Sequence, residues 1–448
     1  MTDQSGQILK RLEADNADFL WVGYHDYGGR GEAKTIPRPS MRSAVTGGVV
    51  FAKANLNMDA QDVQVAGATL LASHGDMLAV PDIRSYTPLP RFPGTVLMHA
   101  HLREPDGSPW AGCPRTRLDE VVGELADEGL SVQAALEPEF TLFDKGAIAE
   151  LIPINRTMMF SQAGLAAANE FIVDLLNELA AMGIKIPQLG KEYGQGQYEL
   201  SLQHGSPIEA VDRYLMFRST VHDIARRHDM IATLMPKPFA HFAGNSLHVH
   251  LSIWNEDGSE DLTPSRSDTT SLSDQGNWFV GGLLAHSPAI TAIGSPTVNS
   301  YKRLLPGSWA PANTYWGYGN RSGVIRVPGV DDRRHIEYRS PDNTAQPYLL
   351  LCALMAAGLD GIKRKIDPGA PFEGDVGHLT AEQIAEQKLA FLPRTLQEAL
   401  DALERDEVVG AALGPEIRRH FLAVKRGELA TYNTIVHSWE RETYLELH

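Results

Sequence analysis

Residues 246–254, Ser-Leu-His-Val-His-Leu-Ser-Ile-Trp, alternate polar and apolar side chains along their whole length. Side chains i and i+2 of a β-strand point to the same face of its sheet, so this alternation predicts a strand with one polar and one apolar face. The polar face carries Ser246, His248, His250 and Ser252. Two histidines at this spacing are, by themselves, more often surface residues than ligands. The segments that accompany them therefore decide what this strand does.

Three other segments repeat the pattern with ionisable side chains on one face. They are residues 131–140 (SVQAALEPEF), 192–200 (EYGQGQYEL) and 335–339 (HIEYR), the second with glycines that permit a turn or bulge. The ionisable side chains in question are Glu137, Glu139, Glu192, Glu199, His335, Glu337 and Arg339. Together the four segments predict a curved sheet whose polar face surrounds a site and whose other face is covered by helices.

Carboxylates that converge in this way, together with an imidazole, need cations to offset their negative charge. Buried like charges either take up protons or bind metal. Each pair alone is usually a solvated strand edge, but their combination in one chain favours a metal site. Oxygen-rich ligands with a single imidazole suit Mg²⁺ or Mn²⁺ better than a structural zinc ion.

Composition and charge exclude several classes of function. The chain has 448 residues, of which 40 are basic and 56 acidic, and its net charge of −16 argues against a nucleic-acid partner. The polar first residues do not resemble a signal peptide, and the most apolar stretch, residues 348–359, is too short to span a bilayer. Two cysteines cannot form a disulfide framework. We therefore expect a cytoplasmic protein with no membrane partner.

The chain is expected to be an α+β protein of two domains. Residues 1–103 form the small N-terminal domain, with β-like stretches at 19–24 and 49–51, and a polar connection rich in proline and glycine follows. Residues 104–448 form the larger catalytic domain. Helices are expected at 116–129, 169–182, 208–227 and 278–293, and over most of 381–447.

The sequence resembles the glutamine synthetase family. The resemblance rests on the motifs Glu137-Pro-Glu139-Phe, Met235-Pro-Lys-Pro238, Gly244-Asn-Ser-Leu-His248-Val-His250-Leu-Ser252, Asn299-Ser-Tyr-Lys-Arg303-Leu-Leu-Pro306-Gly307, Asn320-Arg321-Ser322 and Ile336-Glu337-Tyr-Arg339. Asn-Ser-Tyr-Lys-Arg-Leu-Leu-Pro-Gly with Asn-Arg-Ser shortly after it is highly specific. The resemblance implies an N-terminal β-grasp domain and a catalytic half-barrel of antiparallel strands backed by helices.

The resemblance also assigns roles to individual residues. One metal site maps onto Glu139, Glu192 and Glu199, and a second maps onto Glu137, His248 and Glu337. Arg303 and Gly244 match the positions that hold the glutamate substrate. Arg321 and Arg339 match the catalytic arginines of phosphoryl transfer. His250, Ser252 and Arg326 match positions near the nucleotide phosphates. The implied enzyme activates the side-chain carboxylate of glutamate with ATP, uses two or more Mg²⁺ or Mn²⁺ ions, and works as a homo-oligomer, expected to be a dodecamer of two hexameric rings.

Two departures from the family pattern concern the nucleophile. Ammonia-using members carry a glutamate in the loop Pro-Gly-x-Glu-Ala-Pro, whereas this chain has Trp309 there, and Ala52 stands where the neighbouring subunit would supply an acid. An indole offers a π face to an alkylammonium ion. The chain therefore resembles the γ-glutamylalkylamide ligases, the γ-glutamylmethylamide synthetases above all, and we expect Trp309 to contact the amine. Alternatives are that Trp309 only packs and another acid (Glu32, Asp59 or Asp62) serves ammonia, or that the amine is isopropylamine or a polyamine.

Overall fold

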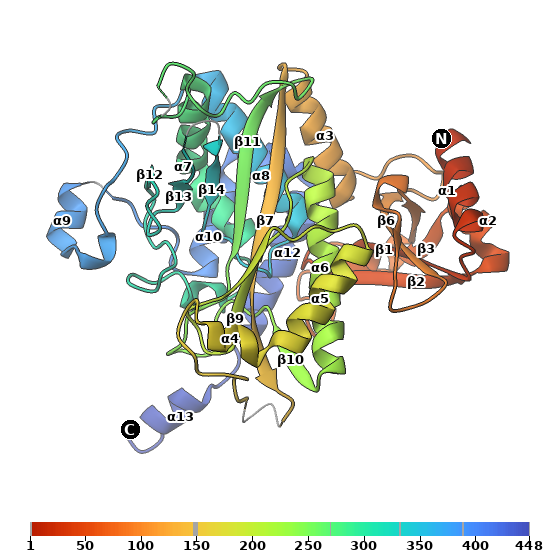
Figure 1. Ribbon diagram of the computed structural model, residues 1–448, viewed down its shortest axis with the longest axis horizontal. Coiled ribbons are helices and arrows are strands. Elements are labelled where there is room, and N and C mark those ends of the chain that lie inside the picture. The colour runs from red at the N-terminus through yellow and green to blue at the C-terminus, as the bar shows by residue number, and fades with distance from the viewer. Residues whose placement is uncertain (1, 147–150, 269, 331–332, 388, 448) are drawn as a thin grey trace.

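The computed structural model describes residues 2–146, 151–268, 270–330, 333–387 and 389–447 (Figure 1). Within these residues, no helix combines the length and the apolar character needed to cross a membrane.

The N-terminal region is built around a six-stranded sheet of order β2-β1-β6-β4-β3, with β5 paired to β6. Its strands are β1 (Phe19–His25), β2 (Gly31–Pro37), β3 (Val49–Ala52), β4 (Asp76–Pro81), β5 (Thr87–Pro88) and β6 (Thr95–Arg103). Helices α1 (Thr2–Ala14) and α2 (Met41–Gly47) accompany it at the outer end of the molecule (Figure 1). The two strands expected here are confirmed as β1 and β3. The β-grasp assignment and the boundary after residue 103 stay predictions.

The second sheet has eight strands in the order β12-β13-β14-β11-β7-β9-β8, with β10 paired to β7. Its strands are β7 (Leu130–Asp144), β8 (Gln188–Lys191), β9 (Gln197–Ser201), β10 (Met230–Thr233), β11 (Leu247–Asn255), β12 (Trp316–Tyr318), β13 (Ile325–Val327) and β14 (Ile336–Tyr338). β11 and β7 form its long central pair (Figure 1). The segment 192–200, expected as one strand with a turn or bulge, is a turn followed by β9, and Glu192 lies just after the end of β8.

The alternation predicted for the central strand is present. From Leu130 to Phe140, every second side chain of β7 is buried, and the side chains between them are half-buried. The buried face packs against helices, because β7 contacts α3 (Pro114–Ala126) and α6 (Pro207–Arg227). The half-buried face is left for the ionisable side chains. The expected mixed α+β architecture with a helix-backed sheet is therefore confirmed.

Two long helices, α7 (Asp274–Gly294) and α8 (Pro347–Arg364), lie in close contact behind the sheet. A Cβ atom on Gly282 would lie 2.0 Å from the carbonyl oxygen of Ala357, so glycine is required for the backbones to approach this closely. The remaining helices are α4 (Gln162–Ala167), α5 (Asn169–Ala181), α9 (Ala381–Glu386), α10 (Leu396–Arg405), α11 (Glu407–Leu413), α12 (Pro415–Tyr432) and α13 (Ser438–Tyr444).

A buried arginine ties the N-terminal sheet to the helices behind the second sheet. Arg115, at the start of α3, donates to Asp82 just after β4 at 2.8 Å and to Asp212 on α6 at 2.5 Å. Its third partner is the hydroxyl of Tyr348 on α8, at 2.8 Å. Arg115 has an exposed fraction of only 2%. One guanidinium thus fixes two regions of the chain relative to each other.

Removing this guanidinium is expected to destabilise the fold strongly. In Arg115→Met, the buried carboxylate of Asp212 loses its guanidinium partner, and Asp82 keeps Arg84 and His101. Leaving a buried carboxylate without its cation costs about 3–5 kcal/mol of unfolding free energy. Urea unfolding followed by circular dichroism measures this loss. The control is Arg226→Ala, which breaks an exposed pair with Asp223 and should cost less than about 1 kcal/mol. Equal losses in the two variants would contradict the role given to Arg115.

Candidate active site

Strand register brings the predicted ligands onto one face of the second sheet. Residues directly opposite each other on paired strands share a face and lie close together. The opposed pairs are Glu139 with Glu199, Glu137 with His248, His250 with Glu337, and Glu337 with Arg326. The pairing of β9, β7, β11, β14 and β13 therefore carries the ionisable cluster across five strands.

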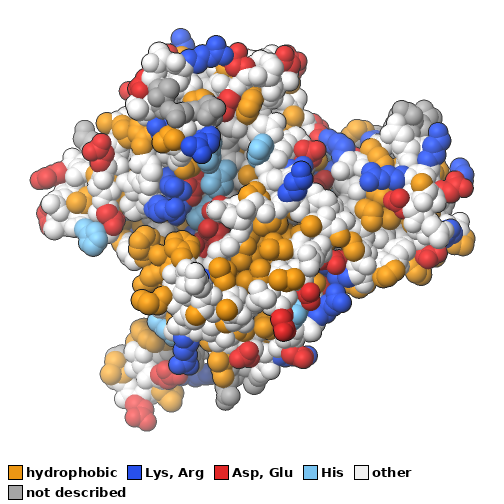
Figure 2. Space-filling view, viewed as in Figure 1, with side chains coloured by type: hydrophobic (Ala, Val, Ile, Leu, Met, Phe, Trp, Pro, Cys, Tyr) orange, Lys and Arg blue, Asp and Glu red, His pale blue; other side chains and the backbone are white. Residues whose placement is uncertain are grey.

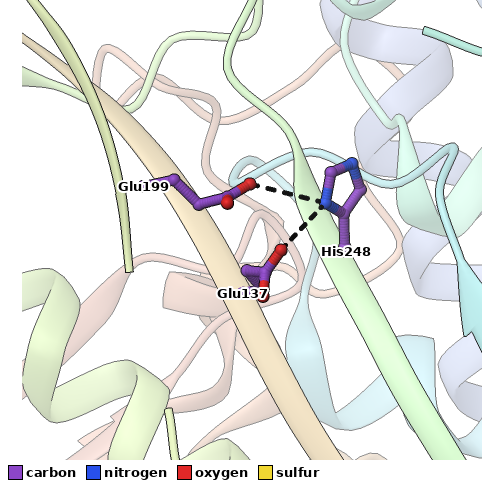
Figure 3. A group of neighbouring side chains, drawn as sticks. All are labelled: Glu137, Glu199 and His248. Atoms are coloured by element: carbon purple, nitrogen blue, oxygen red, sulfur yellow. Dashed lines mark ion pairs between the residues drawn. The ribbon is translucent and has the colours of Figure 1, made fainter. Parts of the chain in front are cut away.

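Three of these side chains form a compact group. Nδ1 of His248 lies 3.6 Å from a carboxylate oxygen of Glu137 and 3.8 Å from one of Glu199 (Figure 3). A third carboxylate, that of Glu337, lies 3.7 Å from the same nitrogen. The candidate ligand atoms of Glu137, Glu199 and His248 all lie within 4.8 Å of one another. This group combines members of both metal sites expected from the family resemblance.

The other two carboxylates of the cluster are oriented by backbone and amide donors. Oε2 of Glu139 accepts from the backbone N–H of Ser246 at 2.9 Å and from Nε2 of Gln197 at 3.0 Å. Glu192 accepts from the backbone N–H of Tyr193 at 3.1 Å. Glu139, Glu192, Glu199 and His248 all line one cavity.

The cluster contains more carboxyl groups than the neighbouring positive charges can keep ionised. Burial, followed by the charges of Glu137 and Glu139, raises the pKa of Glu199 well above its ordinary value. Burial opposes ionisation of Glu137 too, but His248 and His250 outweigh it and lower the pKa of that carboxyl group. Burial and the charge of Glu139 raise the pKa of Glu192 to about 7. At neutral pH the group therefore retains protons that a cation would displace.

The donor set fits a divalent cation. Its carboxylate oxygens and single imidazole are the ligands of Mg²⁺ and Mn²⁺ sites, and coordination requires the imidazole to be neutral. Burial, together with the charge of Arg339, lowers the pKa of His248 and keeps its ring neutral. Nδ1 of His248 is buried without a hydrogen-bond partner among the described residues, although three carboxylates surround it. A bound ion would satisfy this nitrogen.

Glu337 differs from the rest of the cluster because it is paired with two arginines. Arg339 donates to one of its oxygens, and Arg326 donates to the other at 2.7 Å. Burial opposes the charge of Glu337, but the charge of Arg339, with that of Arg326, outweighs it and lowers the pKa of Glu337. Arg339 and Arg326, which are predicted to act near phosphate, thus form ion pairs with Glu337, which is predicted to bind metal.

The predicted substrate residues line the smaller of two cavities that meet at the cluster. This cavity has a volume of about 200 Å³, and its walls include Arg303, Gly244, Trp309, Arg321 and Arg339. A Cβ on Gly244 would lie 2.7 Å from Cγ of Arg303, so only glycine fits beside that side chain. Arg303 is fixed by the carbonyls of Ser340 and Pro341.

The larger cavity, of about 1040 Å³, contains the three predicted nucleotide residues, His250, Ser252 and Arg326. Nδ1 of His250 lies 2.9 Å from Nε2 of His335, and Ser252 accepts from the indole of Trp254 at 2.8 Å. The two cavities share walls formed by Phe160, Glu192, Glu199 and Arg321. Figure 2 shows basic, acidic and histidine side chains gathered in a hollow near the middle of the face in view.

Sequence reasoning missed residues that hold the site or line it. Lys191 has an exposed fraction of 0%, and its ammonium group donates to the carbonyls of Glu192 and Gly194. Tyr193 lines the smaller cavity and lies beside Trp309, with 6.2 Å between ring centroids. Both residues flank Glu192. Neither residue follows a periodic pattern, so the sequence signal that could have identified them was their position next to the predicted ligand Glu192.

Comparisons with known proteins agree with this geometry. The catalytic-domain profile of glutamine synthetase matches residues 111–444. A glutamine synthetase of Halobacterium salinarum is 34% identical and aligns over 100% of this chain and 97% of that protein. A glutamate–methylamine ligase of Methyloversatilis universalis is 32% identical, over 97% of this chain and 98% of that protein. The solved structure of a GmaS–ADP complex superimposes with a TM-score of 0.87 at 30% identity, covering 99% of this chain and 100% of that one.

Metal binding is expected to release protons. Glu199 and half of Glu192 are protonated at pH 7 in the metal-free protein, and a ligating carboxylate must be ionised, so Mn²⁺ binding should expel about one to two protons. Affinity should rise as pH rises through 7. Titration calorimetry in buffers of different ionisation enthalpy measures the number of protons released. Glu199→Gln should weaken binding and release fewer protons, whereas Glu256→Gln, in an exposed turn, should change neither. Proton-neutral binding by the native protein would contradict the cluster as the site.

Proposed function

Because the chain belongs to the glutamine synthetase family, we propose that it joins L-glutamate to a short alkylamine, with methylamine the best candidate. Members of this family depend on ATP and divalent metal ions, and the chain is an ATP-dependent glutamate ligase. The product is a γ-glutamyl amide. The observation that carries the choice of amine is the position of Trp309.

By the family resemblance, Trp309 takes the place of the glutamate that binds ammonium in ammonia-using members. Its indole lines the cavity of about 200 Å³ that also contains Arg303 and three carboxylates of the cluster. The ring is 65% exposed, and the backbone φ of 61° is unusual for a bulky side chain. An indole there cannot take a proton from ammonium, but it can contact an alkyl group and the charge of its nitrogen.

The relatives support two candidate amines. A relative named glutamate–methylamine ligase and solved structures of GmaS favour methylamine. Relatives named glutamine synthetase at 34% identity make ammonia the competing nucleophile. Isopropylamine and polyamines remain as longer members of the same amine class. Trp309 supports an alkylamine, because it offers an apolar surface where ammonia-using members of the family carry a charged side chain.

We assign the glutamate end of the site to Arg303 and Gly244. Arg303 is held through the carbonyls of Ser340 and Pro341, and Nε of its guanidinium has no hydrogen-bond partner among the described residues. A planar, permanently charged guanidinium binds a carboxylate specifically. Gly244 leaves room beside it. Together they orient the substrate so that its side-chain carboxylate faces the cluster.

The nucleotide belongs to the larger cavity, with its phosphates beside His250, Ser252 and Arg326. The proposed metal ligands are Glu137, Glu139, Glu192, Glu199, His248 and Glu337. Divalent ions bound there would neutralise phosphate charge during transfer. Because glutamate and ATP occupy cavities that meet at this cluster, the γ-phosphoryl group has a short path to the glutamate side chain.

Two arginines are placed to stabilise the moving phosphoryl group. Arg321 lines both cavities, and Arg339 lines the smaller one while it pairs with Glu337. The side-chain carboxylate attacks the γ-phosphorus, and ADP leaves. The amine nitrogen then attacks the acyl carbon of γ-glutamyl phosphate, phosphate leaves, and the nitrogen loses a proton. Fixed guanidinium charges stabilise the anionic oxygens in both steps.

We further propose a closed homo-oligomer of two hexameric rings, in which residues 1–103 act as a β-grasp domain. In one chain the N-terminal sheet lies on the opposite side of the molecule from β12 and β13 (Figure 1). Helix α13 projects from the body, and its Trp439 and the following Leu445 are 61% and 75% exposed. Apolar side chains on a projecting helix favour burial against a second copy.

The choice of amine is tested by initial rates of phosphate release with ammonia, methylamine, ethylamine, isopropylamine and a polyamine. One buried methyl group contributes about 0.8 kcal/mol, so kcat/KM for methylamine should exceed that for ammonia about fourfold or more. Trp309→Glu should shift the ratio toward ammonia, whereas Trp309→Phe, which keeps a ring, should preserve it. Ammonia used at least as efficiently as every alkylamine would make the chain a glutamine synthetase.

The assembly is tested by sedimentation velocity. The native chain should sediment as a dodecamer, and the double substitution Trp439→Asp with Leu445→Asp should yield smaller species because it removes the apolar surface of the C-terminal segment. Glu442→Gln, on the same helix, is the control and should leave the assembly intact. A native chain that is fully active as a dilute monomer would overturn this proposal.

A further inference from the structure

A second aromatic side chain lies beside Trp309 at the rim of the smaller cavity. The ring of Tyr193 is 6.2 Å from that of Trp309 between centroids, with 38° between the ring planes. Both rings line the cavity that contains Glu192 and Glu199, and Met159 and Phe160 extend the same apolar wall. The cavity thus has an acidic floor and an aromatic rim.

The position of Tyr193 is fixed from inside the protein. It belongs to the turn between β8 and β9, and the buried ammonium of Lys191 donates to the carbonyls on either side of it, those of Glu192 and Gly194, at 2.5 and 2.6 Å. The side-chain oxygen of Gln197 accepts from the N–H of Gly194 at 2.7 Å. The N–H of Tyr193 itself donates to Glu192. An exposed ring on so constrained a turn is pre-organised to meet a ligand.

We infer that Tyr193 and Trp309 form a subsite for the N-alkyl group of the amine, and that Tyr193 determines specificity. This inference rests on the proposed function. The carbon atoms next to an alkylammonium nitrogen share its positive charge, so they gain both burial and attraction where they lie against the faces of the two rings. Ammonium has no such carbon, so the rings offer it no apolar contact, and the acidic floor is its stronger partner.

The side chain of Tyr193 can be changed without removing the contact that its backbone makes with Glu192, a proposed metal ligand. Tyr193 contacts Glu192 through its backbone N–H, which any substitution other than proline retains. Removing the ring therefore changes the rim while leaving the hydrogen bond to the carboxylate in place. Lys191 differs, because its ammonium fixes the whole turn, and losing it should impair the use of every amine.

The test compares kcat/KM for methylamine and for ammonia in the full-length native enzyme and in variants. Tyr193→Ala should lower kcat/KM for methylamine about fivefold and leave that for ammonia unchanged, whereas Tyr193→Phe, which keeps the ring, should match the native ratio. Lys191→Met should lower both values together. The KM for glutamate and the Mn²⁺ affinity of Tyr193→Ala should stay at native levels, which shows that the variant is folded.

The outcomes distinguish this inference from the proposed function. A native enzyme that prefers methylamine, with a Tyr193→Ala variant of unchanged preference, overturns the subsite and leaves the proposed function intact. A native enzyme that uses ammonia at least as well as every alkylamine overturns both. Equal losses for the two amines in Tyr193→Ala would make Tyr193 a structural residue of the turn and would also refute the subsite.

Discussion

The structure depends on a set of like charges that strand pairing forces together. Glu139 faces Glu199 across one pair of strands, and Glu137 faces His248 across the next. Such a cluster opposes folding unless protons, arginines or metal ions offset it. The raised pKa of Glu199 and the two arginines on Glu337 show the first two forms of compensation. The third form of compensation, a divalent ion, is the one that the family's dependence on divalent metal ions favours.

The surroundings of the cluster follow from this constraint. The buried face of β7 packs on α3 and α6, so only the other face is free to hold charge. The two cavities are lined by ionisable side chains of that face and share Phe160, Glu192, Glu199 and Arg321. In the proposed function, glutamate and ATP would each occupy one of these cavities and meet at the shared residues. The aromatic rim formed by Trp309 and Tyr193 belongs to the smaller cavity, which is the proposed site of glutamate and the amine.

Much of this arrangement could be predicted from the sequence, because it follows strand periodicity. The alternation in residues 131–140 and 246–254 correctly placed Glu137 and His248 on polar faces of β7 and β11. The ends of strands were less predictable: Glu192 lies beyond β8, in a turn whose shape depends on the buried Lys191. The pairing of Arg326 with Glu337 could not be foreseen. The strand that carries Arg326, β13, has three residues and was not recognised as a strand in the sequence, and its register against β14 is set by tertiary packing.

The proposed chemistry depends on divalent cations that the carboxylate cluster would bind between the two cavities. Crystals grown with Mn²⁺ and a non-hydrolysable ATP analogue, measured near the manganese absorption edge, test this claim most directly. Anomalous difference peaks should lie among the carboxylates of Glu137, Glu139, Glu192 and Glu199 and the imidazole of His248. Density for the nucleotide with no anomalous peak at these residues, or manganese bound only elsewhere on the protein, would contradict it.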